Sequence, residues 1–213
     1  MKKKILIIDY GFGNLFGLQK ALTHAGANAG ISENPCDMQS ADALVLPGVG
    51  AFGGGMAEMK KRGFKQPILD QVAAGKPLLG ICLGMQFLFE KSYEFGEHEG
   101  LGILEGEVKK IPVTAGSQCK IPHIGWNALL APGKGGVFAS KLLAGIKPHS
   151  QTYFVHSYAG YPSRTDDIQA NTCYYDSVFP AVVARKNAFG VQFHPEKSGE
   201  TGITLLRNFL SLS

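Results

Sequence analysis

A single cysteine, Cys82, stands between two glycines in Gly80-Ile-Cys82-Leu-Gly84, directly after the apolar run 77–81. The spacing matches a nucleophile elbow, in which the reactive residue lies on a sharp turn between a strand and a helix. Glycines on both sides permit unusual backbone angles and a close approach of strand and helix. The pattern favours Cys82 as a nucleophile, and the helix start after it favours the thiolate. The alternative is a buried core thiol.

A reactive thiolate needs a base, and the base needs a group that orients it. His194 and Glu196 form a suitable pair, because residues two apart in an extended chain point to the same side. Pro195 between them fixes one backbone angle. His194 is therefore the leading base candidate, with His123 and His156 as alternatives that also suit a core or a pocket wall. The other histidines are expected at the surface: His24, His98 and His149.

Acyl transfer also needs N–H donors for the negative charge that develops on oxygen. One donor is the backbone of Leu83, directly after Cys82. A second is expected from the glycine-rich loop 47–55, because open α/β sheets place their sites in loops at the carboxyl ends of strands. This loop lacks the Gly-Lys-Ser/Thr ending of a P-loop, although a plain turn or a phosphate loop stays an alternative.

The elements that must position these residues follow a parallel α/β pattern. Three short apolar runs, 5–8, 43–46 and 77–81, are bounded by Gly or Pro, and a helix-like segment follows each one. Asn14 is expected to cap the first helix, which ends near Gly26. The other expected helices are 56–62, one opened by Pro67 and closed by Gly75, 85–93 and 201–212.

From residue 108 to residue 193 the pattern changes to strand-like pieces separated by turn signals. The expected strands are 108–111, 153–158, 169–174, 182–185 and 190–193. These strands predict an antiparallel extension or a second layer of sheet. The expected fold is therefore α/β, a mostly parallel open sheet with helices on both faces plus an antiparallel extension, in a single domain of residues 1–213.

Composition fits a soluble globular protein, with 45% hydrophobic and 18% charged residues among 213. The net charge of +4 comes largely from the lysines at positions 2–4, and no basic stripe with aromatics indicates a nucleic-acid partner. The first apolar run is too short for a secretory signal, and no stretch is long enough to span a membrane. The scattered cysteines form no Cys-x-x-Cys pair, which favours a reducing, cytoplasmic compartment: Cys36, Cys82, Cys119 and Cys173.

Three segments in this order resemble the class-I glutamine amidotransferases of the triad type across essentially the whole chain. They are Gly80-Ile-Cys82-Leu-Gly-Met-Gln86, Pro47-Gly-Val-Gly50 and Phe193-His194-Pro-Glu196. Within that family, the segments 9–14, 122–127 and 153–158 and the residue Met85 are most similar to the glutaminase subunits of imidazole glycerol phosphate synthases, which serve histidine biosynthesis.

The resemblance implies that Cys82 attacks the carboxamide of glutamine, giving a γ-glutamyl thioester and ammonia. It implies that His194 moves the protons and that Glu196 holds His194. It also assigns the oxyanion hole to the backbone N–H groups of Leu83 and Val49. The substrate contacts it suggests are Gly50, Gln86, Ser157 and Tyr158.

The same resemblance implies a heterodimer with a cyclase subunit of the (β/α)8-barrel type, which receives the ammonia through a channel. It implies no metal ion and no organic cofactor, and it suggests that the partner controls the segment 47–50. The alternatives are another amidotransferase subunit, a thiol hydrolase or peptidase with the same elbow, and a binding module with an inert thiol.

Overall fold

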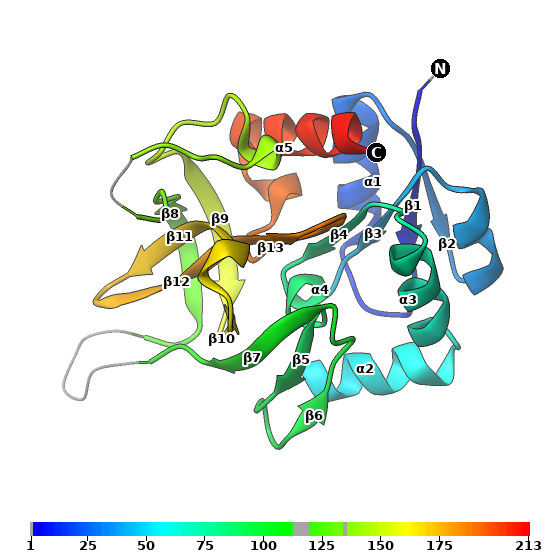
Figure 1. Cartoon of the computed structure of the whole chain (residues 1–213), viewed down its shortest axis with the longest axis horizontal. Helices are drawn as coiled ribbons and strands as arrows, with labels where there is room; N and C mark the ends of the chain where they lie inside the picture. The colour runs from blue at the N-terminus through cyan, green and yellow to red at the C-terminus, as the bar shows by residue number, and fades with distance from the viewer. Residues whose placement is uncertain (1, 113–119, 134–135) are drawn as a thin grey trace.

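A seven-stranded sheet forms the centre of the computed structural model, which describes residues 2–112, 120–133 and 136–213 (Figure 1). Five neighbouring strands run parallel, in the spatial order β13 (Ala188–Val191), β4 (Leu78–Ile81), β3 (Ala43–Leu46), β1 (Lys4–Ile8) and β2 (Asn28–Ser32). Beside β13 the sheet continues antiparallel with β12 (Ser177–Arg185) and then β11 (Ile168–Tyr174). The predicted parallel sheet with an antiparallel extension is confirmed.

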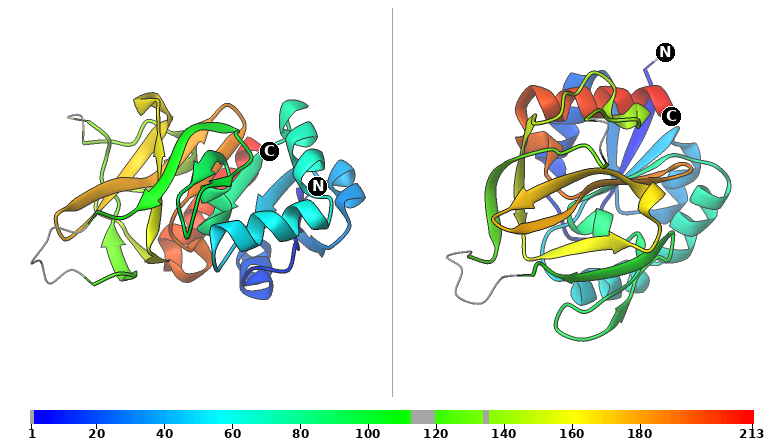
Figure 2. Two further views of the ribbon diagram at one scale, coloured as in Figure 1. Left: turned by 90° about the horizontal axis from the view of Figure 1, so that it is seen from below. Right: turned by 60° about the vertical axis from the view of Figure 1, so that its left-hand side comes forward.

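Helices cover both faces of this sheet (Figures 1 and 2). On one face lie α1 (Leu15–Ala25) and α5 (Gly199–Leu212), and on the other lie α2 (Phe52–Lys61) and α3 (Lys65–Ala73). Successive side chains of a strand point to opposite faces. Ile5 and Ile7 therefore join the core beneath α1 and α5, whereas Leu6 and Ile8 join the core beneath α2 and α3. All four side chains are buried, as expected for strands covered on both sides.

Two smaller sheets complete the described part of the chain. One contains β10 (Tyr158–Pro162), β7 (Leu104–Lys110), β5 (Phe89–Ser92) and β6 (His98–Glu99), and the other pairs β8 (His123–Ala128) with β9 (Gln151–His156). The five predicted strand pieces between residues 108 and 193 overlap β7, β9, β11, β12 and β13. Four short 3-10 turns connect the larger elements: Pro35–Ser40, Lys141–Leu143, Thr165–Asp167 and Pro195–Lys197.

The helix predicted for residues 85–93 is wrong. The helix after Cys82 is a single turn, α4 (Leu83–Gln86), and the chain then enters strand β5. Phe89 pairs with Leu104 of β7, and Leu83 to Phe89 are all buried, so this segment has no exposed helical face. Pairing with a distant strand decided the structure, and the local sequence does not reveal that partner.

Several helix starts also differ from the prediction, since α3 begins at Lys65, before Pro67, and α5 begins at Gly199, before residue 201. Asn14 makes no side-chain cap to α1, although its backbone carbonyl accepts the N–H of Leu18 at 3.1 Å. Helix α2 begins at Phe52 rather than residue 56, despite the low helix propensity of the glycines in its first turns. Close packing explains why glycines stand there, because a Cβ at Gly53 would lie 2.6 Å from the His98 ring and a Cβ at Gly55 would lie 2.5 Å from the Phe87 ring.

None of the helices in the described ranges has the length and apolar character needed to span a bilayer. The thiols of Cys36, Cys82 and Cys173 are free. Cys119, the fourth cysteine of the sequence, lies outside the described residues.

Candidate active site

Cys82 occupies a strained turn at the end of β4. Its φ of 54° and ψ of −109° are unusual for a residue with a side chain, and its N–H donates to the carbonyl of Val191 at 2.8 Å. A Cβ at Gly84 would lie 1.8 Å from the carbonyl oxygen of Leu46, and a Cβ at Gly80 would lie 2.5 Å from that of Gly84. Only glycines permit this approach, which supports the elbow inferred from the sequence.

His194 and Glu196 lie side by side after β13. Nδ1 of His194 is 2.9 Å from Oε1 of Glu196, and both side chains are almost fully buried. The backbone holds the imidazole in place, because the N–H of His194 donates to Tyr153 and its carbonyl accepts the hydroxyl of Ser198. A carboxylate only accepts, so Nδ1 carries a proton and Nε2 is the nitrogen left for chemistry.

The charge state of His194 depends on its two neighbours. Burial lowers the pKa of His194, but hydrogen bonding and charge interaction with Cys82 and Glu196 outweigh burial and raise the pKa to about 10. Nε2 is buried and makes no ideal hydrogen bond within the described residues, yet Cys82 is close enough to act on the ring. The arrangement therefore favours an imidazolium at His194 at neutral pH.

The other base candidates have their ring nitrogens occupied. His156 is bonded through Nδ1 to the carbonyl of Tyr158 at 2.9 Å and through Nε2 to Nδ1 of His123 at 3.1 Å. His123 contacts Asn127 through its remaining nitrogen, at 2.8 Å. Burial lowers the pKa of His156 to about 3, so this ring is neutral at pH 7. His194 therefore stays the best candidate, while His24 and His149 are exposed and His98 is half-buried.

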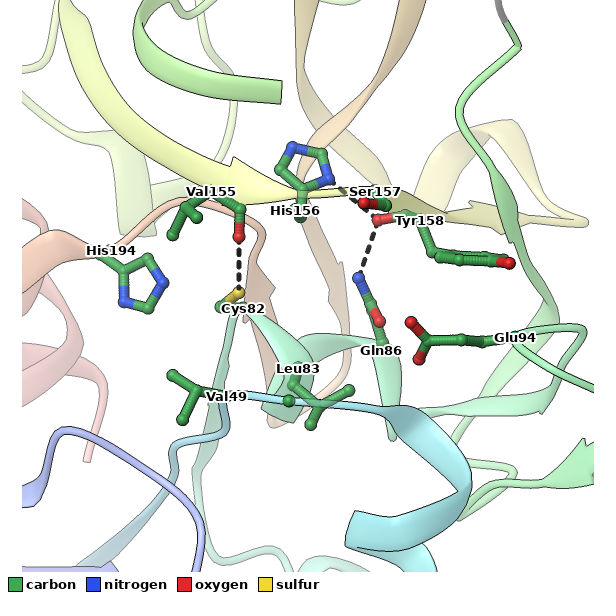
Figure 3. A pocket seen from close by; sticks show the side chains of 11 residues that line it. Val49, Cys82, Leu83, Gln86, Glu94, Val155, His156, Ser157, Tyr158 and His194 are labelled. Atoms are coloured by element: carbon green, nitrogen blue, oxygen red, sulfur yellow. Dashed lines mark hydrogen bonds between the residues drawn. The ribbon is translucent and has the colours of Figure 1, made fainter. Parts of the chain in front are cut away.

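One pocket of about 200 Å³ collects almost all of the predicted site residues (Figure 3). It is lined by Val49, Gly50, Cys82, Leu83, Gln86, Ser157, Tyr158 and His194. Glu196 does not line it and instead contacts the imidazole of His194. Figure 3 shows His194 and Cys82 at one side of the pocket, with Glu94 and Tyr158 at the other.

The loop between β3 and α2 forms another wall of this pocket. The hydroxyl of Tyr10 donates to the carbonyl of Pro47 at 3.0 Å, and a Glu94 carboxylate oxygen accepts the N–H of Phe52 at 2.6 Å. Between these two anchors, the N–H groups of residues 48–50 donate no hydrogen bond within the described part of the chain. The loop is thus fixed at both ends and unbonded in the middle.

Four residues of the site were missed by sequence reasoning, and one of them is Val155, whose carbonyl oxygen is 3.9 Å from the sulfur of Cys82. Glu94 lies in a charged loop that gave no sign of contact with the 47–50 segment. Tyr10 follows the first strand, and its buried hydroxyl reaches the loop only through the fold. Gln192 is fully buried, with Nε2 3.8 Å from the sulfur of Cys82. The sequence did contain one signal for Gln192, which is its polar side chain inside the apolar run 189–193.

Comparisons with known proteins agree with this geometry. The family model described as "Glutamine amidotransferase class-I" matches residues 6–212. "Imidazole glycerol phosphate synthase subunit HisH 1" of Legionella pneumophila (strain Lens) is 44% identical over 210 residues, which cover 98% of this chain and 99% of the relative. "Imidazole glycerol phosphate synthase subunit HisH" of Desulfitobacterium hafniense is 47% identical over 203 residues, with coverage of 95% and 92%. The protein of that name from Salinibacter ruber is 46% identical over 209 residues, with coverage of 97% and 93%.

Solved structures support the fold. "Crystal structure of glutamine amidotransferase" gives a TM-score of 0.73 at 20% identity and covers 98% of this chain and 97% of that one. "Structure of PurLQS from Thermotoga maritima" gives 0.73 at 19% identity, with coverage of 99% for both chains.

Replacing Gly84 tests the close approach at the elbow. Gly84→Ala should lower the free energy of unfolding by more than about 3 kcal/mol, because the new Cβ meets a backbone carbonyl that has no room to move. Gly54→Ala is the matched control, since no atom lies within 4 Å of a Cβ there and alanine favours the helix by about 0.5–1 kcal/mol. Urea unfolding measures both changes, and equal stability of the two variants would contradict the packing.

The raised pKa of His194 predicts a pH-dependent stability difference. A proton bound more tightly in the folded state stabilises it fully below the unfolded pKa of about 6.5, and that gain is lost as the pH rises towards 10. The stability lost in His194→Gln should therefore be largest near pH 6 and shrink by pH 10, as followed by urea unfolding. His149→Gln, an exposed control, should show a small and constant difference. A His194→Gln difference that grows with pH would refute the assignment.

Proposed function

The chain belongs to the class-I glutamine amidotransferase family, and from this premise we propose that it is the glutaminase subunit of an imidazole glycerol phosphate synthase. It hydrolyses glutamine to glutamate and ammonia, and a partner subunit uses the ammonia in histidine biosynthesis. The observation that carries the proposal is the meeting of Cys82 and His194 in one pocket, with Glu196 bonded to the far side of the imidazole. The chemistry needs no metal ion or organic cofactor.

In the first half of the reaction, the thiolate of Cys82 attacks the carboxamide carbon of glutamine and the C=O electrons move onto oxygen. Leu83 and Val49 line the pocket, and their backbone N–H groups donate no hydrogen bond within the described residues, which supports a role for both N–H groups in binding this oxyanion. The tetrahedral intermediate collapses when Nε2 of His194 gives its proton to the amide nitrogen, which leaves as ammonia. Cys82 is left as a γ-glutamyl thioester.

The second half returns the site to its starting state. His194, now neutral, takes a proton from water as the water oxygen attacks the thioester carbon. The same N–H donors stabilise the second oxyanion. Collapse breaks the carbon–sulfur bond and releases the γ-carboxylic acid, which loses its proton to solvent as glutamate, leaving the thiolate beside the imidazolium. Glu196 keeps Nδ1 protonated throughout, so that Nε2 alone exchanges protons.

The far side of the pocket holds the amino-acid end of glutamine. Glu94 is the acidic side chain of the lining, and its carboxylate has free lone pairs for the substrate ammonium beside the one that accepts the N–H of Phe52. Ser157, Tyr158 and the backbone at Gly50 line the same region. Gln86 also contributes, although its amide nitrogen already donates to the carbonyl of Tyr158 at 2.8 Å.

The partner is a cyclase subunit of the (β/α)8-barrel type that docks over the pocket mouth, and the heterodimer is cytoplasmic. Apolar side chains flank this mouth without cover, because Val49, Ile124 and Trp126 are 41%, 57% and 55% exposed. Ile124 pairs between β8 and β9 with Val155, a pocket residue, and Trp126 lies two residues further along β8. Exposed apolar groups next to a site whose product must be handed on suit a subunit interface.

Removing the thiol separates the two halves of the enzyme. In the complex, Cys82→Ala should abolish glutamine-dependent synthesis, with a loss of at least about 10⁴-fold, because a triad member acts as part of a unit. Ammonium ions supplied in excess should still support synthesis by the partner. Cys36→Ala, at an exposed cysteine, should keep both activities. Glutamate release and product formation are the readouts, and persistent use of glutamine by Cys82→Ala would show that the nucleophile is misassigned.

Removing the hydrogen bond between the Tyr10 hydroxyl and the Pro47 carbonyl tests whether the loop 47–50 contributes to the oxyanion hole. Burial raises the pKa of Tyr10, so the hydroxyl stays a protonated donor. Tyr10→Phe releases the carbonyl of the Pro47–Gly48 peptide, so the next peptide, Gly48–Val49, which carries the N–H of Val49, is held less firmly for binding the oxyanion. In the complex, kcat for glutamine should fall about three- to tenfold, as expected for a hydrogen bond that contributes about 1 kcal/mol, while KM stays unchanged.

Tyr161→Phe is the matched control, because the buried Tyr161 hydroxyl has no hydrogen-bond partner within the described residues. Its kcat should equal that of the wild type. If Tyr10→Phe raises KM and leaves kcat unaltered, the loop anchor does not act on the oxyanion.

A further inference from the structure

A buried glutamine lies against the nucleophile on the side of the sheet. Gln192 comes directly after β13, two residues before His194, and its side chain has no exposed surface. Its Nε2 is 3.8 Å from the sulfur of Cys82, within the range of a hydrogen bond to sulfur, and its Oε1 is 3.1 Å from Nε2 of Gln86. Desolvating an amide is costly unless its groups are bonded, so these two contacts hold Gln192 in its place.

The hydrogen bonds define which end of this amide faces the sulfur. The carbonyl of Tyr158 can only accept, so Gln86 must turn its NH₂ group towards that carbonyl, at 2.8 Å. The same NH₂ group reaches Gln192, which must therefore present its carbonyl oxygen to Gln86. The NH₂ group of Gln192 is then the end that faces Cys82. A flipped Gln192 would place two donors face to face.

The base of this chain of hydrogen bonds is also fixed. The Tyr158 carbonyl accepts a second bond from Nδ1 of His156, at 2.9 Å, so both of its lone pairs are used. The neutral His156 ring carries its proton on Nδ1, because a carbonyl offers nothing to an unprotonated nitrogen. The Tyr158 carbonyl thus fixes the orientation of the Gln86 amide, which in turn fixes that of Gln192.

Two polar groups compete for the sulfur. The carbonyl of Val155, at 3.9 Å, accepts an S–H proton and so favours the neutral thiol. An N–H of Gln192 donates to the sulfur and so favours the thiolate, since hydrogen bonds to an ionised partner are the stronger ones. His194 and the Tyr10 hydroxyl, which follow β13 and β1, are the titratable groups that interact with Cys82, and Glu94 lies across the pocket. Gln192 adds a donor that does not titrate.

We propose that Gln192 is a catalytic residue that donates a hydrogen bond to the Cys82 sulfur and stabilises the attacking thiolate, with Gln86 as the positioning residue that orients its amide. This inference rests on the proposed glutaminase function. During attack, negative charge moves from sulfur to the carboxamide oxygen, and no proton leaves Gln192. The side-chain amide of Gln192 therefore keeps the Cys82 thiolate available over a wider pH range than the imidazolium of His194 would alone.

The test is the rate at which iodoacetamide alkylates Cys82 in the assembled complex. Peptide mass spectrometry resolves Cys82 from the other cysteines, and the rate is measured from pH 5 to pH 9. Gln192→Glu has the same shape and replaces the donor by an acceptor. At pH 7 it should lower the alkylation rate about 10- to 100-fold, the usual worth of a hydrogen bond to a charged group, and move the pH midpoint upward. In the same variant kcat for glutamine should fall, and KM should stay within about twofold.

Two further variants separate a chemical role from a structural one. Gln192→Met keeps the bulk without adding charge, and it should shift the pH midpoint of alkylation upward by less than Gln192→Glu does. This variant also provides the test if Gln192→Glu folds poorly. In a Gln192→Met background, Gln86→Met should have little further effect on the alkylation rate, because the influence of Gln86 on the sulfur passes through Gln192. Gln151→Glu, at an exposed position of β9, should match the wild type.

The proposal is overturned if the well-folded Gln192 variants show the alkylation rate and pH midpoint of the wild type, even where thermal stability or kcat is lower. Alkylation needs no glutamine, so this readout stands apart from the proposed function. A wild-type complex without glutaminase activity would refute the function and leave the thiolate measurement intact. A glutaminase whose Gln192 variants react normally would refute only the role of Gln192.

Discussion

The site depends on how closely the turn after β4 approaches the end of β3. A Cβ at Gly84 would lie 1.8 Å from the carbonyl oxygen of Leu46, a distance that no side chain tolerates. Because the two backbones touch here, Leu83 lies against the loop that begins at Pro47, and a Cβ at Gly48 would lie 2.8 Å from its side chain. One steric constraint therefore brings the two backbone segments of the proposed oxyanion hole together, whichever residues fill the rest of the pocket.

A second constraint is that charge must be buried beside the sulfur without instability. An isolated buried ion is costly, but the buried imidazolium of His194 has the carboxylate of Glu196 on one side and the sulfur of Cys82 nearby. Burial lowers the pKa of His194, but hydrogen bonding and charge interaction with Cys82 and Glu196 outweigh burial and raise it. Burial lowers the pKa of His156, and the hydrogen bond to the Tyr158 carbonyl does not offset that effect. Two histidines in one pocket region thus acquire different charge states, and only His194 is equipped to exchange protons near neutral pH.

Sequence reasoning brought the right residues together where their positions depend on spacing along the chain. The turn from Gly80 to Gly84 is local. His194 and Glu196 also meet as expected, although Glu196 lies in the 3-10 turn Pro195–Lys197 and not in the extended chain that the prediction assumed. Sequence reasoning failed where a secondary-structure element or a side-chain contact depends on a distant partner strand. The helix predicted for 85–93 became a strand because Phe89 pairs with Leu104, and Gln192 faces the sulfur because parallel strands align β13 with β4. Local periodicity reveals neither the pairing of β5 with β7 nor the alignment of β13 with β4. The single-domain organisation stays a prediction.

The pocket wall also links the nucleophile to the surface that flanks its mouth. Hydrogen bonds run from Cys82 through Gln192 and Gln86 to the carbonyl of Tyr158, and from there to His156 and His123. His123 belongs to β8, the strand that exposes Ile124 and Trp126. Each bond in this chain constrains the orientation of the next side chain, so the position of β8 and the direction of the N–H that faces the sulfur are linked by an unbroken series of hydrogen bonds. The exposed apolar side chains of β8 and the nucleophile therefore belong to one hydrogen-bonded wall, although they lie far apart in the sequence.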